Sequence, residues 1–274
     1  MKNLREAYKK QNFNNASVAK KMQEYLQLYT IIGGMPRVVN DYIKSGDLNL
    51  ARKRQSEIVA SYKNDVIKYA ETQARPKILK TFESIPAQLS RKNKKFFYDE
   101  IDANDNYASE RKYGKAIFWL KDAGIVNFCY NLSEPALPLN MNKKIGAFKI
   151  YMRDNGLLMS MLDRDVPKAI ISGDFEVNQG GIIENLFAEE IMTRYGDVTY
   201  FERKNQLEID FILNIDGVAT AVEVKSGNNL QAKSLDALAE KYKTVKKLMK
   251  FEPRENIEEA NGIWHCPLFM MMFL

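Results

Sequence analysis

Apolar residues recur every three to four positions along residues 18–32 and again along residues 50–71. This spacing puts them on one stripe of a helix and predicts two amphipathic helices. The segment Gly33-Gly34-Met35-Pro36 ends the first helix, and its proline is suited to begin another because its φ is already near the helical value. We therefore expect residues 1–74 to form a helical segment.

Residues 75–145 combine helical patterns with a basic loop. Apolar stripes at 77–84 and 113–123 predict helices, and the alternation at 125–130 predicts a strand. Helices followed by a strand pair are typical of a winged helix-turn-helix, which places a helix in the major groove and a basic loop on phosphate. The candidate nucleic-acid-binding residues of this loop are Arg91, Lys92, Lys94 and Lys95. A winged-helix-like unit that serves only packing or protein contact fits the same pattern.

Residues 146–274 have a mixed helix and strand pattern. After a strand pattern at 148–152, the sequence predicts a helix, a strand, a hairpin, a helix and a strand at 182–195, 198–201, 207–226, 230–242 and 246–251. From residue 181 the predicted order is α-β-β-β-α-β, which indicates an α/β domain.

The hairpin has the clearest local signal. Asp216-Gly217 at its centre favours a type I′ turn, because that turn needs positive φ at both central residues. A two-residue turn makes Ile215 face Val218 and fixes the register of both strands.

Continued along the strands, this register places charged residues opposite one another on one face. Asp210 falls opposite Glu223, and Glu208 falls opposite Lys225. Two facing carboxylates repel, but cross-strand Cβ atoms are roughly 4.5–5.5 Å apart, so both can bind one divalent cation. A solvated strand face with ordinary charge pairs fits the same register.

Composition narrows the class of protein. The chain has 274 residues, 45% of them hydrophobic, and no apolar run long enough to cross a membrane. Two cysteines and one histidine exclude a finger-type zinc site and argue against histidine acid/base catalysis. So few cysteines make a structural disulfide unexpected, and we expect a cytoplasmic protein with no membrane partner.

Charge is uneven along the chain. Residues 1–145 contain 26 Lys and Arg against 15 Asp and Glu, whereas residues 146–274 contain 15 against 20. A basic half beside an acidic half fits a phosphate-binding unit next to a cation-binding unit. Basic helices with solvated faces account for the charge equally well.

Four short motifs occur in an order that resembles the C-terminal part of a bacterial and archaeal family of AAA+ ATPases. The motifs are Gly33-Gly34-Met35-Pro36-Arg37, Gly181-Ile182-Ile183-Glu184-Asn185, Glu208-Ile209-Asp210-Phe211 and Glu223-Val224-Lys225-Ser226-Gly227. The last three resemble domain of unknown function 4143, and the resemblance spans roughly residues 20–274. The element order and the acidic residues are similar to the PD-(D/E)XK nuclease-like fold.

That resemblance implies a catalytic set of Glu184, Asp210, Glu223 and Lys225. It implies Mg²⁺ held by Asp210, Glu223 and the main-chain carbonyl of Val224, with Lys225 acting on the attacking water and Glu184 adding a further contact. One departure from the family is large, because no G-x-x-x-x-G-K-[ST] motif is present. We therefore expect no ATP site in this chain, which would be a fragment or a short form whose ATPase domain is supplied in cis or in trans.

Two functions from different classes follow. The first is a Mg²⁺-dependent phosphodiesterase, a nuclease acting on DNA. The alternative is a non-catalytic nucleic-acid or protein-interaction module of an ATPase, in which the carboxylates form a structural cluster with Lys225 and Arg203. Binding of a divalent cation between Asp210 and Glu223 separates the two.

Overall fold

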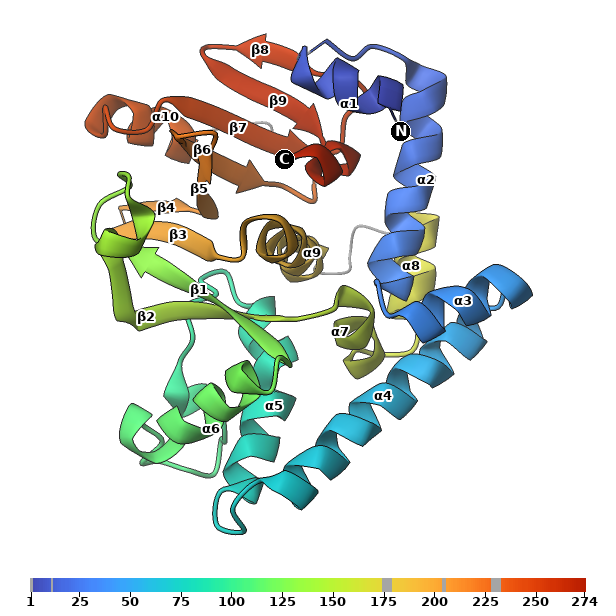
Figure 1. Ribbon diagram of the computed structural model, residues 1–274, viewed down its shortest axis with the longest axis vertical. Helices are drawn as coiled ribbons and strands as arrows, with labels where there is room; N and C mark the ends of the chain where they lie inside the picture. Colours follow the sequence, from blue (N-terminus) through green and yellow to red (C-terminus); the bar gives the residue numbers. More distant parts are fainter. Residues whose placement is uncertain (1, 11, 174–178, 204–205, 228–232) are drawn as a thin grey trace. The chain divides into compact units, whose positions relative to one another are not determined.

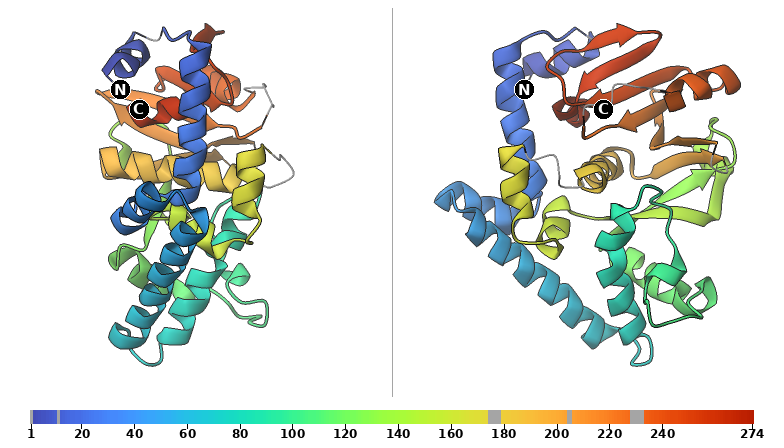
Figure 2. Two further views of the ribbon diagram at one scale, coloured as in Figure 1. Left: turned by 90° about the vertical axis from the view of Figure 1, so that its right-hand side faces the viewer. Right: turned by 180° about the vertical axis from the view of Figure 1, so that it is seen from behind.

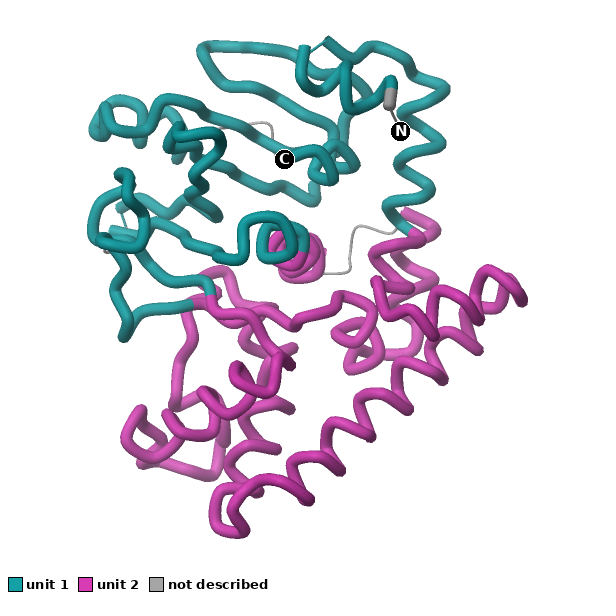
Figure 3. Tube along the Cα trace, viewed as in Figure 1, with its two compact units in different colours: residues 1–27, 129–148, 190–274 teal, residues 28–128, 149–189 magenta. Residues whose placement is uncertain are grey.

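The computed structural model describes the chain apart from residues 1, 11, 174–178, 204–205 and 228–232 (Figure 1). The described residues form two compact units, and each unit is assembled from separate stretches of the chain (Figure 3). Unit 1 consists of residues 1–27, 129–148 and 190–274, and unit 2 of residues 28–128 and 149–189. These units do not follow the predicted boundaries at residues 74 and 145.

Unit 2 is built from helices. They are α3 (Pro36–Ser45), α4 (Leu48–Tyr69), α5 (Arg75–Ser90), η1 (Tyr98–Glu100), α6 (Glu110–Asp122), α7 (Asn155–Met161) and α8 (Val166–Ser172), with the adjoining parts of α2 (Ala16–Ile32) and α9 (Gln179–Tyr195). Helices α3 and α4 lie side by side as a helical hairpin (Figures 1 and 2). Gly46 ends α3 with a φ of 65°, and the side chain of Asp47 caps α4 by accepting from Asn49 N.

The glycine motif after α2 makes a close junction with α7. The Asp154 carboxylate accepts hydrogen bonds from Gly34 N at 2.7 Å and from Leu157 N at 2.9 Å. A Cβ on Gly156 would lie 2.2 Å from the carbonyl oxygen of Ile32, and Gly33 has a φ of 71°. The motif is therefore a packing joint that only glycine permits.

Unit 1 contains most of two β-sheets, and helix α10 connects two strands of the second sheet. The strands are β1 (Val126–Leu132), β2 (Lys143–Met152), β3 (Val198–Arg203), β4 (Leu207–Ile209), β5 (Phe211–Ile215), β6 (Val218–Val224), β7 (Lys247–Glu252), β8 (Glu258–Ala260) and β9 (Ile263–Pro267). The first sheet has the order β2-β1-β3-β4 and the second the order β5-β6-β7-β9-β8. The first parts of β1 and the last parts of β2 extend into unit 2. The remaining elements are α1 (Lys2–Lys9), η2 (Leu139–Asn142), α10 (Lys233–Lys241) and η3 (Leu268–Phe273).

Helix α10 supplies apolar side chains to the core of unit 1. Leu235 and Leu238 are fully buried and pack in one cluster with Ile212, Ala221 and Tyr242. Leu235 and Leu238 are three positions apart, which places both on the face that meets the strands. The predicted start of this helix at residue 230 lies outside the described residues.

The strand that was predicted for a winged helix belongs to a larger sheet. Strand β1 neighbours β2, which contains the strand predicted at 148–152 for the next domain, and on its other edge it pairs in parallel with β3, with Cys129 opposite Val198. The two strands are therefore part of a sheet shared with the C-terminal segment. The architecture as a whole is a helical N-terminal part followed by a mixed α/β region with two sheets. None of the described helices is both long and apolar enough to cross a membrane.

Candidate metal centre

The hairpin of β5 and β6 has the predicted turn and register. Ile215 pairs with Val218 and Phe211 with Val222. Asp216 and Gly217 have φ values of 52° and 81°, as a type I′ turn requires.

The register is interrupted at Asp210, and one predicted pairing is wrong. The chain bends at Asp210, and the preceding strand β4 pairs with β3 in the first sheet. Glu208 consequently lies opposite Glu202 and not opposite Lys225. The physical reason is that the preceding strand finds its partner in β3, which the local turn signal does not encode.

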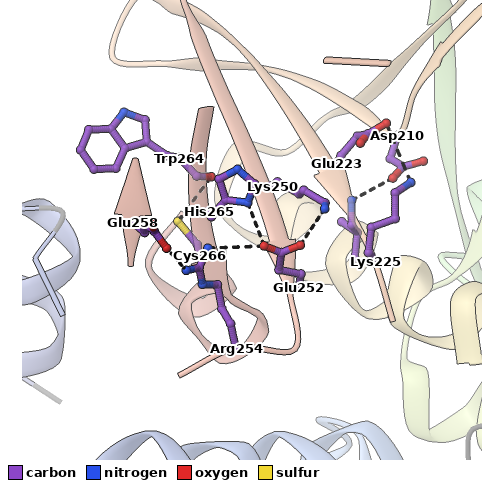
Figure 4. Close-up of polar contacts among 11 residues, drawn as sticks. Asp210, Glu223, Lys225, Lys250, Glu252, Arg254, Glu258, Trp264, His265 and Cys266 are labelled. Carbon is purple, nitrogen blue, oxygen red and sulfur yellow. Dashed lines mark hydrogen bonds and ion pairs between the residues drawn. The ribbon is translucent and has the colours of Figure 1, made fainter. Parts of the chain in front are cut away.

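Asp210 and Glu223 still meet on the same side of the hairpin (Figure 4). Asp210 is half-buried at the bend and accepts a hydrogen bond from Val224 N at 2.9 Å. Lys225 places its Nζ 3.8 Å from Glu223 Oε1. The structure thus brings together three of the four residues of the predicted catalytic set, and Val224, whose carbonyl is the third predicted metal ligand, lies between Glu223 and Lys225 in the sequence.

The electrostatics of Glu223 are unusual for a carboxylate. Its side chain is only 3% exposed. The pKa of Glu223 is raised to about 7, mainly by burial and in part by the negative charge of Asp210, while Lys225 and a hydrogen bond from Ser234 oppose the shift. A pair of carboxylates in this state has a deficit of positive charge, which a divalent cation would fill.

The donor set fits Mg²⁺ in a limited way. Among the described residues no group of three or more His, Cys, Asp and Glu side chains converges. Two carboxylates suffice for Mg²⁺, however, because this ion usually keeps several waters and binds proteins through one or two carboxylates. The residues present therefore suit an ion that remains largely hydrated.

A row of charged residues that the sequence reasoning missed continues across the second sheet (Figure 4). Glu223 pairs with Lys250, Lys250 with His265, and His265 with Glu258, on four neighbouring strands. The alternation of Lys250 and Glu252 with apolar residues in β7 is the one sequence signal that could have indicated two of them.

Glu252 links two members of this row, Lys250 and His265. Lys250 is fully buried with its Nζ 2.7 Å from Glu252 Oε2, and His265 Nδ1 lies 2.8 Å from Glu252 Oε1. Burial raises the pKa of Glu252, but hydrogen bonds from Lys250 and His265 outweigh burial and lower it. The sole histidine of the chain thus binds Glu252 in a polar cluster next to the carboxylate pair.

Glu184 belongs to a separate cluster in unit 2. Its carboxylate contacts Lys149 Nζ at 3.1 Å and Lys94 Nζ at 2.8 Å, and it accepts a short hydrogen bond from the hydroxyl of Tyr151. Burial raises the pKa of Glu184, but the charges of Lys149 and Lys94 outweigh burial and lower it. Both oxygens of this carboxylate are therefore engaged within the unit.

The predicted nucleic-acid-binding loop is partly used by the fold. Lys94 is the partner of Glu184, so one residue of the basic loop and one residue of the catalytic set meet each other. Arg91 stacks on the ring of Phe97 at 4.5 Å and pairs with Glu100. Lys92 is exposed, and Lys95 forms a backbone bridge to Lys149.

Two family models match the chain. One, described as a domain of unknown function (DUF8612), matches residues 23–168, which is more than half of the chain. The other, described as a domain of unknown function (DUF4143), matches residues 179–269 and confirms the resemblance to that domain. No curated protein and no solved structure matches the chain.

Proposed function

The chain belongs to the family described as a domain of unknown function (DUF8612), and we infer its activity from the residues of the hairpin. We propose that it carries a Mg²⁺-dependent nuclease-like site that acts on DNA. Asp210, Glu223 and the carbonyl of Val224 hold the ion, and Lys225 acts on the attacking water. The observation that carries the proposal is the buried carboxylate of Glu223 beside Asp210, with Lys225 Nζ at 3.8 Å.

Each residue has a role that its surroundings support. Bound Mg²⁺ would supply Lewis acidity and offset the charge that develops on a phosphodiester. The Lys225 ammonium lies 3.8 Å from Glu223 Oε1, which puts a positive charge beside the proposed position of the ion and of a phosphate oxygen. Glu184 is left out of the proposal because Lys94, Lys149 and Tyr151 engage its carboxylate.

The partners in the proposal are DNA and an AAA+ ATPase domain. DNA is the substrate class that a nuclease-like fold implies, and the ATPase domain follows from the resemblance of residues 179–269 to DUF4143. A PD-(D/E)XK-type arrangement of the second sheet is part of the same proposal.

Thermal unfolding with and without metal tests the site. Mg²⁺ or Mn²⁺ at a hundredfold excess over its Kd should raise the Tm by roughly 5–10 °C, because only the folded chain assembles the site. Asp210→Asn keeps an acceptor for Val224 N but removes one charge, and it should abolish this increase. Lys225→Ala should keep the increase and lose cleavage of DNA.

The results that contradict the proposal differ in meaning. An increase in Tm that survives Asp210→Asn places the ion elsewhere. An increase without cleavage of any DNA leaves a metal centre that lacks the proposed activity.

One observation supports the alternative function, a non-catalytic interaction module. Only two acidic side chains meet at the hairpin among the residues that the structure describes, and Lys225 already offsets part of their charge. A non-catalytic nucleic-acid or protein-interaction module fits this cluster. The absence of any metal-dependent change in Tm would favour it.

A further inference from the structure

A basic hollow opens at the C-terminal end of α10. It measures about 640 Å³ and is lined by the end of β3, a residue that follows β1, and the segment 241–246 between α10 and β7. Four of its side chains are cationic and one, Glu134, is anionic. The cations are Arg203, Lys241, Lys243 and Lys246.

These cations are only partly offset by the protein, through the charge of Glu134 on Arg203. Within the part of the chain that the structure describes, none of the four forms an ion pair. Lys243 Nζ donates to the main-chain oxygen of Ala239 at 2.9 Å, and Arg203 donates to the hydroxyl of Tyr242 at 2.7 Å. All four side chains are exposed, and Glu134 is the one anion of the lining, so the hollow presents a net positive charge to solvent.

The backbone that carries the lysines is fixed in place. The Tyr242 ring packs edge-on against Phe201, with the ring centroids 5.0 Å apart. The hydroxyl of Thr244 donates to Pro135 O at 3.0 Å, and Lys246 N donates to Ala219 O at 3.0 Å. Binding at the hollow therefore costs little ordering of the chain.

The chemistry of the lining selects the kind of ligand. Its one aromatic ring, that of Tyr242, is 8% exposed and turned inward against Phe201. A protein partner would need an apolar centre to the interface, whereas a phosphodiester backbone needs only cations at an open surface. The hollow fits the backbone of a nucleic acid.

Helix α10 links the hollow to the candidate metal centre. Ser234, in its first turn, bonds to Glu223, and Lys241 ends the same helix. Seven residues of helix span roughly 10 Å, and this length corresponds to about three base steps of duplex DNA at 3.4 Å each. We propose that the basic hollow holds the phosphate backbone of duplex DNA a few base pairs from the carboxylate pair. The choice of DNA rests on the proposed function; the binding of a phosphate backbone does not.

Fluorescence anisotropy with a labelled short duplex, in EDTA, tests the proposal without any cleavage. The variant K241A/K243A/K246A should raise the Kd about tenfold or more near 50 mM NaCl, and the slope of log K against log[NaCl] should fall by about one for each lysine that contacts phosphate.

A matched control removes the same charge elsewhere in unit 1. Lys9, Lys20 and Lys21 are exposed on α1 and α2, and K9A/K20A/K21A should leave the Kd within about twofold of the native value, since non-contacting charges act only through a screened field. Equal weakening by both variants, unchanged binding by the first, or no binding by the native chain each overturns the proposal. Tight binding without Mg²⁺-dependent cleavage would instead count against the proposed nuclease alone.

Discussion

Glu223 shows at the scale of one residue how the sheet makes an ordinary strand position chemically unusual. Its neighbours Val222 and Val224 hold it in β6, where it is removed from water. Lys250, in register with it on β7, and Lys225 both favour its charged form, yet burial keeps its pKa near 7. Stability of the metal-free protein should therefore depend on the protonation of this one group.

The expected direction follows from linkage. The pKa of Glu223 in the folded chain, about 7, lies above the ordinary value of 4.5, so the folded state binds the proton more tightly than the unfolded state. Below pH 4.5 the carboxyl is protonated in both states, so its ionisation does not change the free energy of unfolding. Between pH 4.5 and 7 stability falls, by roughly 3 kcal/mol in all.

Glu223→Gln should remove this fall, and urea unfolding in EDTA at pH 5 and pH 7.5 measures it. The variant should be the more stable protein at pH 7.5 and nearly equal to the native chain at pH 5. A native and a variant protein with the same pH dependence would show that Glu223 ionises normally.

At the scale of elements, Glu184 joins three segments. It lies on α9 and contacts Lys149 of β2 and Lys94 of the loop after α5. On the same helix, Gly181 approaches the carbonyl of Leu89 so closely that a Cβ would lie 2.3 Å from it. The motif that contains both residues therefore packs α9 against α5 and β2.

Glu184→Gln should cost about 3–5 kcal/mol of unfolding free energy, because it removes the carboxylate that forms an ion pair with the fully buried Lys149. Glu190→Gln is the matched control on α9, since Glu190 pairs with Arg194 at the surface and should cost less than about 1 kcal/mol. Urea unfolding compares the two. Equal stabilities together with a loss of DNA cleavage would assign Glu184 to catalysis.

Local signals were enough to predict most elements. The helix stripes at 18–32 and 50–71 correspond to α2 and α4, which begin two residues earlier than expected. The Asp216-Gly217 turn set the register of β5 and β6 because backbone sterics act over two residues. The helix pattern at 77–84 was too short because α5 continues through Pro86 to Ser90.

Long-range pairings were not predictable from the chain. The switch of sheets at Asp210 depends on β3, and β3 depends in turn on a parallel neighbour, β1, about seventy residues earlier. The cluster likewise combines Lys250 and Glu252 of β7 with His265 of β9. Its members carry no common motif in the sequence, so only their register unites them.

For the whole molecule, we expect no binding of ATP. The sequence has no phosphate-binding loop, and the main-chain N–H of Gly34 in its glycine pair is already bonded to Asp154. Isothermal titration calorimetry with Mg·ATP should show no saturable heat. A saturable heat that survives Asp210→Asn would reveal a nucleotide site outside the residues discussed above.

The interleaving of the two units gives synthesis on the ribosome an order of events. The chain passes between the units at residues 27/28, 128/129, 148/149 and 189/190, so unit 2 has been synthesised in full while unit 1 still lacks residues 190–274. At the usual speed of translation this last segment takes roughly 4–17 s. In the first part of that time, until β3 (residues 198–203) has been made, β1 can pair with β2 but has no β3 for its other edge, and an unpaired edge is open to wrong partners. The nascent chain should therefore depend most on chaperones in the interval between the completion of unit 2 and the synthesis of β3.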